Sequence, residues 1–396
     1  MSLGDGIHNS IDRRKFLQGA GAGLAAGLLA TSSPGGAQAP ATPESIVHAT
    51  AMGPLSEKEK LDRIASNCWP FRYLFKLNSD IATEPAEVAR MKKKYGEITM
   101  LDVPTFTKET LPGVYQMDLI SSFFGDGDDP SMFVNESVTG KSGPHTVTEF
   151  DPSSKSGRKW LDKMANKQVT TGTRCHHISN DAPRDICEPD AERRKAGVEV
   201  AKKWLDGAAI LGAKSMRVNT GGPTIAPPPA AEAGTFKSPP GAKAGLFSDV
   251  AGYPRNDALA QYLRYAIESY KEMADYGGRL GIKVTIENHW GVAANPINIR
   301  IIVEEVNSPF CEASPDFCNW EHEYLLFHGL QALAPYAHTH AHAKYWDRWP
   351  NPDVQRNVRI MLNANYLGVF GLEYEGGPWD GVEGAQYLYR EVLAAL

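Results

Sequence analysis

The chain has 396 residues, a formal net charge of −6, and 42% hydrophobic and 22% charged residues. These proportions are typical of a globular protein that buries an ordinary core. No basic block and no stripe of alternating basic and aromatic residues is present in the sequence. The composition therefore argues against nucleic acid as a partner.

Residues 1–39 are predicted to be an export signal. The pair Arg13-Arg14 is followed by a Gly/Ala-rich apolar run over residues 19–30, and residues 37–39 form the small-x-small pattern of a cleavage site. The segment resembles a Tat signal peptide, which implies a periplasmic or extracellular protein that takes up any cofactor before export. The alternative is a tethered N-terminal helix, but the run is short and Gly-rich for a membrane span. We expect no membrane contact after cleavage.

Residues 40–60 are predicted to be a linker and residues 61–396 a single domain, in which short apolar strands alternate with amphipathic helices. Strands are predicted near 63–71, 114–124, 170–178, 215–220, 282–288, 310–316, 338–345 and 369–375. Helices are predicted near 102–110, 156–167, 190–211, 256–280, 296–306, 321–336, 352–366 and 381–395. Eight strand–helix units predict a (β/α)8 TIM barrel.

A doubly wound open sheet is the alternative fold. It would normally carry a Gly-rich phosphate loop after its first strand, and residues 67–70, Asn-Cys-Trp-Pro, do not form one. Two connections are long, residues 125–155 after the second strand and 221–255 after the fourth. In a barrel both lie on the C-terminal face, where they would cap a pocket.

The sequence contains five cysteines and no CxxC pair, so their spacing excludes a zinc ribbon. Outside the cytoplasm a disulfide is allowed, and Cys175–Cys187 and Cys311–Cys318 are the pairs nearest in sequence. Five reduced, half-buried thiols are the alternative, and the sequence does not decide between them.

Polar residues at the C-terminal ends of four predicted strands are the strongest indication of function. Glu287 follows the apolar run Ile282-Lys283-Val284-Thr285-Ile286, and Asp316, His342 and Glu373 lie at the ends of the next three strands. The active sites of barrels are built at these ends. Carboxylates with one imidazole suit Mn²⁺, Mg²⁺ or Co²⁺ better than a structural zinc site, which prefers thiolates.

These motifs resemble the xylose isomerase-like TIM-barrel family, in particular its sugar phosphate isomerase/epimerase group, over most of residues 61–396. The matching segments are IENHWG, DFCN, HAK and LEYEG. The resemblance implies that Glu287, Asp316, His342 and Glu373 hold a divalent metal, with Mn²⁺ preferred and Mg²⁺, Co²⁺ or Zn²⁺ as alternatives. Asn319 stands where the family often has a histidine.

Further residues are candidates for binding substrate. Arg348 falls where ketose epimerases of the family carry a substrate-binding arginine, so the resemblance implies that role. Lys344 is either a ligand of substrate oxygens or a surface lysine, and Arg217 belongs either to the site or to a core network. The remaining candidates stand near strand ends and are His177, His289 and Trp290.

The resemblance implies proton transfer next to a carbonyl through an enediolate, with Glu287 and Glu373 as the acid and base. The expected activity is that of a metal-dependent sugar isomerase or epimerase that acts on a small sugar or glycoside, and the sequence allows assembly as a homo-oligomer. A lyase or hydrolase acting on 3-keto glycosides is one alternative, and a non-catalytic sugar-binding protein is another. A DNA-repair endonuclease shares the barrel, but the acidic net charge argues against it.

Overall fold

A computed structural model describes residues 54–77, 84–140, 143–184, 186–222, 257–350 and 352–396. The predicted export signal lies outside the described residues, as do most of the predicted linker and most of the 221–255 connection. The described helices include none that is long and apolar enough to cross a membrane.

Eight parallel strands form one curled sheet, in the order β8-β7-β6-β5-β2-β1-β10-β9. The strands are β1 (Ile64–Asn67), β2 (Gln116–Ile120), β5 (Arg174–Ser179), β6 (Ser215–Arg217), β7 (Lys283–Ile286), β8 (Cys311–Ala313), β9 (His340–Trp346) and β10 (Val369–Gly376). A parallel bridge between Asp316 and His342 joins the two ends of this order. The predicted (β/α)8 barrel is confirmed.

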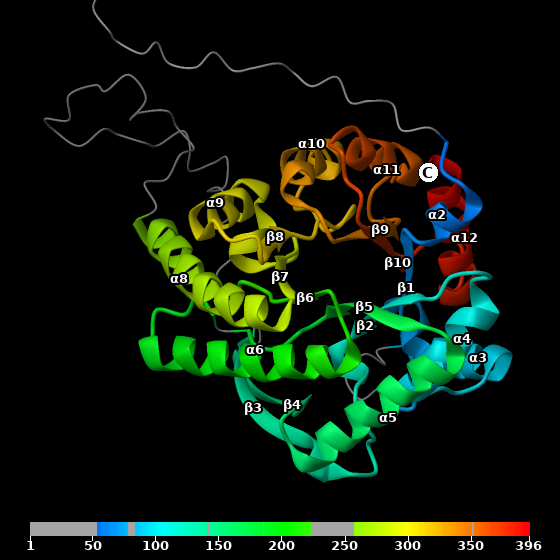
Figure 1. Cartoon of the computed structure of the whole chain (residues 1–396), viewed down its shortest axis with the longest axis horizontal. Helices are drawn as coiled ribbons and strands as arrows, with labels where there is room; N and C mark the ends of the chain where they lie inside the picture. Colours follow the sequence, from blue (N-terminus) through cyan, green and yellow to red (C-terminus); the bar gives the residue numbers. More distant parts are fainter. Residues whose placement is uncertain (1–53, 78–83, 141–142, 185, 223–256, 351) are drawn as a thin grey trace, which may run out of the picture. The chain divides into compact units, whose positions relative to one another are not determined.

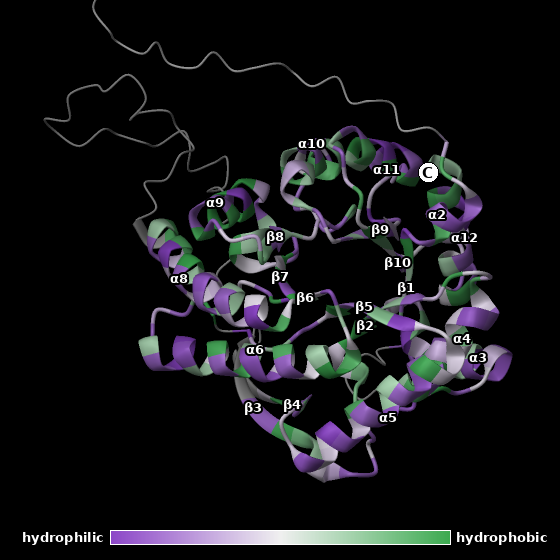
Figure 2. Cartoon of the chain, viewed as in Figure 1, coloured by the Kyte–Doolittle hydropathy of each residue, from purple (hydrophilic) through white to green (hydrophobic). Residues whose placement is uncertain are grey.

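Helices surround the strands (Figure 1). They are α2 (Glu57–Leu61), α3 (Pro85–Tyr95), α4 (Val103–Thr110), α5 (Lys155–Thr171), α6 (Ala191–Leu211), α8 (Asp257–Leu280), α9 (Pro296–Val306), α10 (Leu325–Leu333), α11 (Val354–Asn363) and α12 (Gly381–Ala395). Hydrophobic and hydrophilic residues alternate along α6 and α8, as expected for helices with one face on a sheet (Figure 2). The alternation explains why periodicity located these helices.

The barrel strands are buried on both faces, which is why they appear in the sequence as short apolar runs. Side chains of β9 at alternate positions, His340, His342 and Lys344, point into the barrel interior and are at most 2% exposed. Strand β10 pairs in register, with Gly371 opposite His342 and Glu373 opposite Lys344. This register brings the polar ends of the two strands together.

Gly371 is required by the packing of the interior. A Cβ atom at this position would lie 2.8 Å from Cε1 of His340 and 3.0 Å from Oδ2 of Asp118. Real Cβ contacts are not this short, so any side chain here would push the buried histidine or aspartate away.

The connection after the second barrel strand is not structureless. It contains an antiparallel hairpin of β3 (Phe133–Gly140) and β4 (Gly143–Phe150), which the sequence did not predict. The strand predicted near 170–178 begins only at Arg174, because α5 runs to Thr171 and is capped by Gly172 at φ +67°. The strand predicted near 63–71 ends at Asn67, where a 3-10 helix over Trp69–Leu74 follows.

All five cysteines lie within the described residues and are buried free thiols. The allowed disulfides Cys175–Cys187 and Cys311–Cys318 are therefore not formed. Burial raises the pKa of Cys311 to about 12, and it also raises the pKa of Cys318. These thiols pack as small apolar residues rather than as reactive groups.

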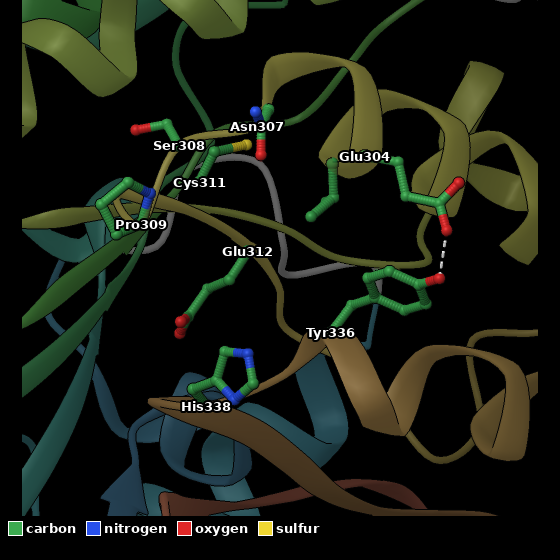
Figure 3. A pocket seen from close by; sticks show the side chains of 9 residues that line it. Glu304, Asn307, Ser308, Pro309, Cys311, Glu312, Tyr336 and His338 are labelled. Carbon is green, nitrogen blue, oxygen red and sulfur yellow. Dashed lines mark hydrogen bonds between the residues drawn. The ribbon is translucent and has the colours of Figure 1, made fainter. Parts of the chain in front are cut away.

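Two cavities lie at opposite ends of the barrel strands. One, of about 430 Å³, is at the N-terminal ends of β8 and β9, where Glu312 and His338 line it (Figure 3). The other, of about 510 Å³, is here called the hairpin cavity. Its lining includes residues from the hairpin, from the segment after β1 and from the segment after β5, among them Trp69, Phe133, Asn135, Thr148, Asp181 and Arg184.

Candidate metal centre and active site

Three buried donor atoms converge from the segments that follow β7 and β8 and from β9 itself. Nδ1 of His342 lies 3.4 Å from Oε2 of Glu287 and 3.9 Å from Oδ2 of Asp316. A carboxylate or imidazole atom from each of these residues lies within 4.8 Å of the others. Neither Nδ1 of His342 nor Oδ2 of Asp316 has a hydrogen-bond partner. Buried polar atoms without partners are costly, so this arrangement is suited to a cation.

Backbone donors hold the Asp316 carboxylate in place. Its Oδ1 accepts from the backbone N–H groups of Cys318 at 2.7 Å and Asn319 at 2.8 Å. The Asp316 N–H donates to Oδ1 of Asn288 at 2.8 Å. Because Oδ1 is occupied by the turn, only Oδ2 remains to face His342. The turn and the predicted metal thus use different oxygens of Asp316.

The imidazole of His342 is oriented from its other side by Asp118. Nε2 of His342 lies 2.9 Å from Oδ2 of Asp118, and both side chains are fully buried. A proton on Nε2 that is donated to this carboxylate leaves the lone pair on Nδ1, toward Glu287 and Asp316. Carboxylates commonly orient metal-binding histidines in this way.

Glu287 is paired with a buried arginine as well as an amide. Its Oε2 accepts from Nη1 of Arg217 at 2.5 Å and its Oε1 from Nδ2 of Asn319 at 2.8 Å. Nη2 of Arg217 also donates to Oδ1 of Asp181 at 2.7 Å. Burial opposes ionisation of Glu287, but Arg217 and His342 outweigh it and hold the pKa of this carboxyl well below its usual range.

Glu373 lies beside the opposite nitrogen of the same imidazole. Its Oε2 is 3.6 Å from Nε2 of His342, and its Oε1 accepts from Nζ of Lys344 at 2.8 Å. Nζ of Lys344 also lies 3.0 Å from Oε2 of Glu375 and 3.7 Å from Oδ2 of Asp316. Glu373 is therefore outside the group of three converging donors, and its role as a fourth ligand stays a prediction.

Burial raises the pKa of Asp316 to about 7, with the neighbouring charges of Glu373 and Glu287 adding to the effect and that of Lys344 opposing it. Burial opposes protonation of His342, but the charges of Glu287 and Glu373 outweigh it and raise the pKa of this imidazole well above its usual range. The buried carboxylates of this cluster still outnumber its cations, which are Arg217, Lys344 and His342. The carboxylates are Asp118, Glu287, Asp316, Glu373 and Glu375. A divalent cation at the unpartnered atoms would restore the balance of charge, so the residues fit one.

The remaining predicted substrate residues are placed differently. The His177 ring stacks on His340 at a centroid distance of 4.0 Å, deep in the barrel interior, and its Nδ1 bonds to Ser215 Oγ at 2.8 Å. The ring centroids of His289 and Trp290 are 4.1 Å apart. Burial lowers the pKa of His289 to about 4. Arg348 is exposed and stacks on two tryptophans, with 4.6 Å from its guanidinium carbon to each ring.

Asp118 belongs to the buried cluster, although the sequence did not single it out. It stands alone in an apolar strand, Gln-Met-Asp-Leu-Ile, where a single aspartate gives no signal. In the structure it accepts from Nδ2 of Asn67 at 2.6 Å and from Oγ of Ser179 at 2.8 Å, besides its bond to His342. Its partners come from other strands, so only the barrel topology reveals them.

The fold and the cluster agree with the family comparison. The model of the xylose isomerase-like TIM barrel family matches residues 139–395, so the chain belongs to that family. The search of curated proteins found no match.

Several solved structures are similar in fold. The 3-keto-D-glucoside 4-epimerase of E. coli is 14% identical, covers 83% of this chain and 99% of its own, and has a TM-score of 0.50. A xylose isomerase-like TIM barrel protein of Mycobacterium smegmatis in complex with magnesium is 17% identical, with coverages of 84% and 97% and a TM-score of 0.47. The D-psicose 3-epimerase of Clostridium cellulolyticum with D-tagatose is 12% identical, with coverages of 76% and 92% and a TM-score of 0.47.

Proposed function

We propose that the protein is a divalent-metal-dependent sugar isomerase or epimerase that moves a proton at a carbon next to a carbonyl. The observation that supports this most is the convergence of Glu287, Asp316 and unpartnered Nδ1 of His342, with Glu373 beside the other nitrogen of the same ring. Two carboxylates thus flank one buried imidazole, as transfer of a proton from and to a sugar requires. The sugar epimerases among proteins of the same fold support the same reaction class.

The metal would be held by Glu287, Asp316 and His342, with Mn²⁺ preferred, and when bound would polarise the carbonyl of the sugar. Glu287 is fixed by Arg217 and Asn319, so its position does not depend on substrate. Glu373 is 7% exposed against 1% for Glu287. We assign proton abstraction to Glu373, the more accessible carboxylate. For isomerisation Glu373 would return the same proton to the neighbouring carbon, whereas for epimerisation Glu287 would give a proton to the opposite face after taking one up itself.

The test is deuterium exchange followed by proton NMR. The protein is loaded with Mn²⁺ in D₂O and offered free ketoses, aldoses and 3-keto glycosides. We expect deuterium at a carbon next to the carbonyl, together with a new sugar isomer. In Glu373→Gln this exchange is lost while Mn²⁺ still binds, because the three converging donors are untouched. Glu375→Gln is the matched control, since Glu375 also contacts Lys344 but does not approach His342.

Two other functions give different results in the same experiment. Loss of the aglycone from a 3-keto glycoside, with an unsaturated keto-sugar as product, would identify a lyase. A sugar-binding protein would bind the sugar equally in the wild type and in Glu373→Gln, with no exchange in either. Exchange absent from every substrate despite bound Mn²⁺ contradicts the proposed reaction.

We also propose that the protein is exported through the Tat pathway and cleaved after Ala39, which leaves the barrel as the mature domain. The support is the sequence pattern around Arg13-Arg14 and residues 37–39. N-terminal sequencing of the secreted form is expected to begin at Pro40. Replacing both arginines by lysines should retain the full-length precursor in the cytoplasm, and unchanged export would refute the assignment.

A further inference from the structure

The hairpin cavity lies against the site described above and is not explained by it. The cavity has a volume of about 510 Å³, within the range of pockets that enclose drug-sized ligands. A metal, two carboxylates and a sugar ring make no use of a chamber lined by Trp69 and Phe133. Its position and chemistry therefore indicate a second part of the ligand.

One wall of the hairpin cavity is connected directly to Glu287. Asp181 lines the cavity, and its Oδ1 accepts from Nη2 of Arg217 at 2.7 Å. Nη1 of the same guanidinium donates to Oε2 of Glu287 at 2.5 Å. The cavity is thus separated from one of the two catalytic carboxylates by a single side chain.

The opposite wall is connected to Glu373. Trp69 lines the cavity, and Arg72 bonds to the carbonyl oxygens of Trp69 at 3.2 Å and of Glu375 at 2.7 Å. The carboxylate of Glu375 lies 3.0 Å from Nζ of Lys344, which bonds to Glu373. Contacts from both carboxylates therefore lead to the same cavity, which places it beside the sugar position.

The lining of the cavity combines aromatic rings with a few polar groups. Phe123 stacks on Phe75 at 4.3 Å, and Phe133 meets Phe150 edge-on at 6.3 Å, so these rings are held rigidly. Asn135 and Thr148 lie opposite each other on the hairpin, and the Thr148 hydroxyl donates to Oδ1 of Asn135 at 3.1 Å. The lining also holds charged side chains, but Arg184 pairs with Glu149 and Asp181 with Arg217, so their charges are compensated. Rigid aromatic rings beside compensated charges favour a planar apolar ligand.

We propose that the hairpin cavity binds a planar, apolar group attached to the sugar, so that the substrate is a glycoside with an aromatic aglycone. The inference rests on the proposed function for the position of the sugar ring. The hairpin supplies the outer wall of this subsite, with the side chains of Asn135 and Thr148 facing the bound ring.

The test compares two ligands that differ only in the aglycone, methyl and phenyl 3-keto-β-D-glucoside, by calorimetry on the Mn²⁺-loaded protein. We expect the phenyl glycoside to bind at least about tenfold more tightly, a difference typical of burying an apolar group in a pocket. Thr148→Trp fills the cavity from an exposed position and should reduce that ratio to about one. Asn135→Trp is a second variant on the same face, with the same expected result.

Val134→Trp is the matched control. Val134 is 48% exposed and does not line the hairpin cavity, although Glu149, which it faces across the hairpin, does. It should keep the wild-type preference for the phenyl glycoside. Three results would overturn the subsite. They are equal affinity for both glycosides in the wild type, a preference for the phenyl glycoside that survives Thr148→Trp, and no binding of either glycoside. A preference without deuterium exchange would support the subsite and contradict the proposed reaction.

Discussion

The bond between Asp118 and His342 makes a specific prediction about metal affinity. In Asp118→Asn the amide oxygen still accepts from Nε2 of His342, so the lone pair of Nδ1 still faces Glu287 and Asp316, but the negative charge behind the imidazole is lost. In Asp118→Ala both the charge and the acceptor are lost, and either nitrogen of His342 then carries the proton. We therefore expect a graded loss of Mn²⁺ affinity.

The magnitude follows from the geometry of this bond. Nε2 of His342 and Oδ2 of Asp118 are 2.9 Å apart and both side chains are 0% exposed, so the bond is short and charge-assisted. Bonds of this kind are worth about 1.5–3 kcal/mol. Loss of a partner behind a metal ligand typically weakens binding about 10–100-fold, or about 1.4–2.7 kcal/mol. We expect about tenfold for Asp118→Asn and about a hundredfold for Asp118→Ala.

Isothermal titration with Mn²⁺ measures the effect, and circular dichroism with thermal unfolding verifies that each variant is folded. Ser179→Ala is the control, because its hydroxyl lies 3.1 Å from the same Nε2 and 2.8 Å from Oδ1 of Asp118 but carries no charge. Its affinity should fall less than threefold, by roughly the cost of one neutral hydrogen bond. A folded Asp118→Ala variant with wild-type Mn²⁺ affinity would refute the reasoning.

Three further predictions concern the interior and the site. Gly371→Ala should lower the free energy of unfolding, measured in urea, by about 1–3 kcal/mol, because the new Cβ would lie 2.8 Å from His340. Gly376→Ala should change the free energy of unfolding little, because the nearest atom to its new Cβ is 3.9 Å away. The Mn²⁺ affinity should rise at least about tenfold per pH unit below about pH 7, because the Asp316 carboxyl, with its pKa raised to about 7, must lose its proton to bind. A flat profile from pH 5 to 7 would contradict this. Lys344→Met should destabilise the metal-free protein by about 3 kcal/mol, since the side chains of Lys344 and Glu373 are 2% and 9% exposed. Lys58→Met should have little effect in the same assay, because the side chains of Lys58 and Asp62 are 84% and 32% exposed.

The sequence allowed the barrel to be predicted because its signals are local. Each buried strand is a short apolar run and each helix an amphipathic one, so the eight strands and their order could be assigned without distant contacts. The boundary near residue 170 was wrong because Val169-Thr170-Thr171, with its β-branched residues, is typical of a strand. The structure continues α5 through these residues, and Val169 is 80% exposed on its outer side.

The hairpin of β3 and β4 escaped prediction for a different reason. Most of its side chains over residues 133–136 and 146–150, where burial is described, are not buried, so neither a period of two nor an apolar run distinguishes it from a loop. Its stability comes from pairing across the two strands and from the packing of Phe150 against Trp160 and Trp204, at 5.4 and 5.8 Å. These contacts join residues that are distant in the sequence and are therefore invisible in it.

The pairing of the site's charges could not be predicted from the sequence either, and it bears most directly on the chemistry. Glu287 and Glu373 were predicted from their positions at the ends of strands. The structure shows that each pairs with its own buried cation, Glu287 with Arg217 at 2.5 Å and Glu373 with Lys344 at 2.8 Å. Each pair compensates the charge of its glutamate without a metal. Within the group of Glu287, Asp316 and His342, the buried atoms that lack hydrogen-bond partners are instead Oδ2 of Asp316 and Nδ1 of His342. We therefore propose that the metal binds on the Asp316–His342 side of the cluster and that Glu373, held by Lys344, acts on the substrate rather than on the ion.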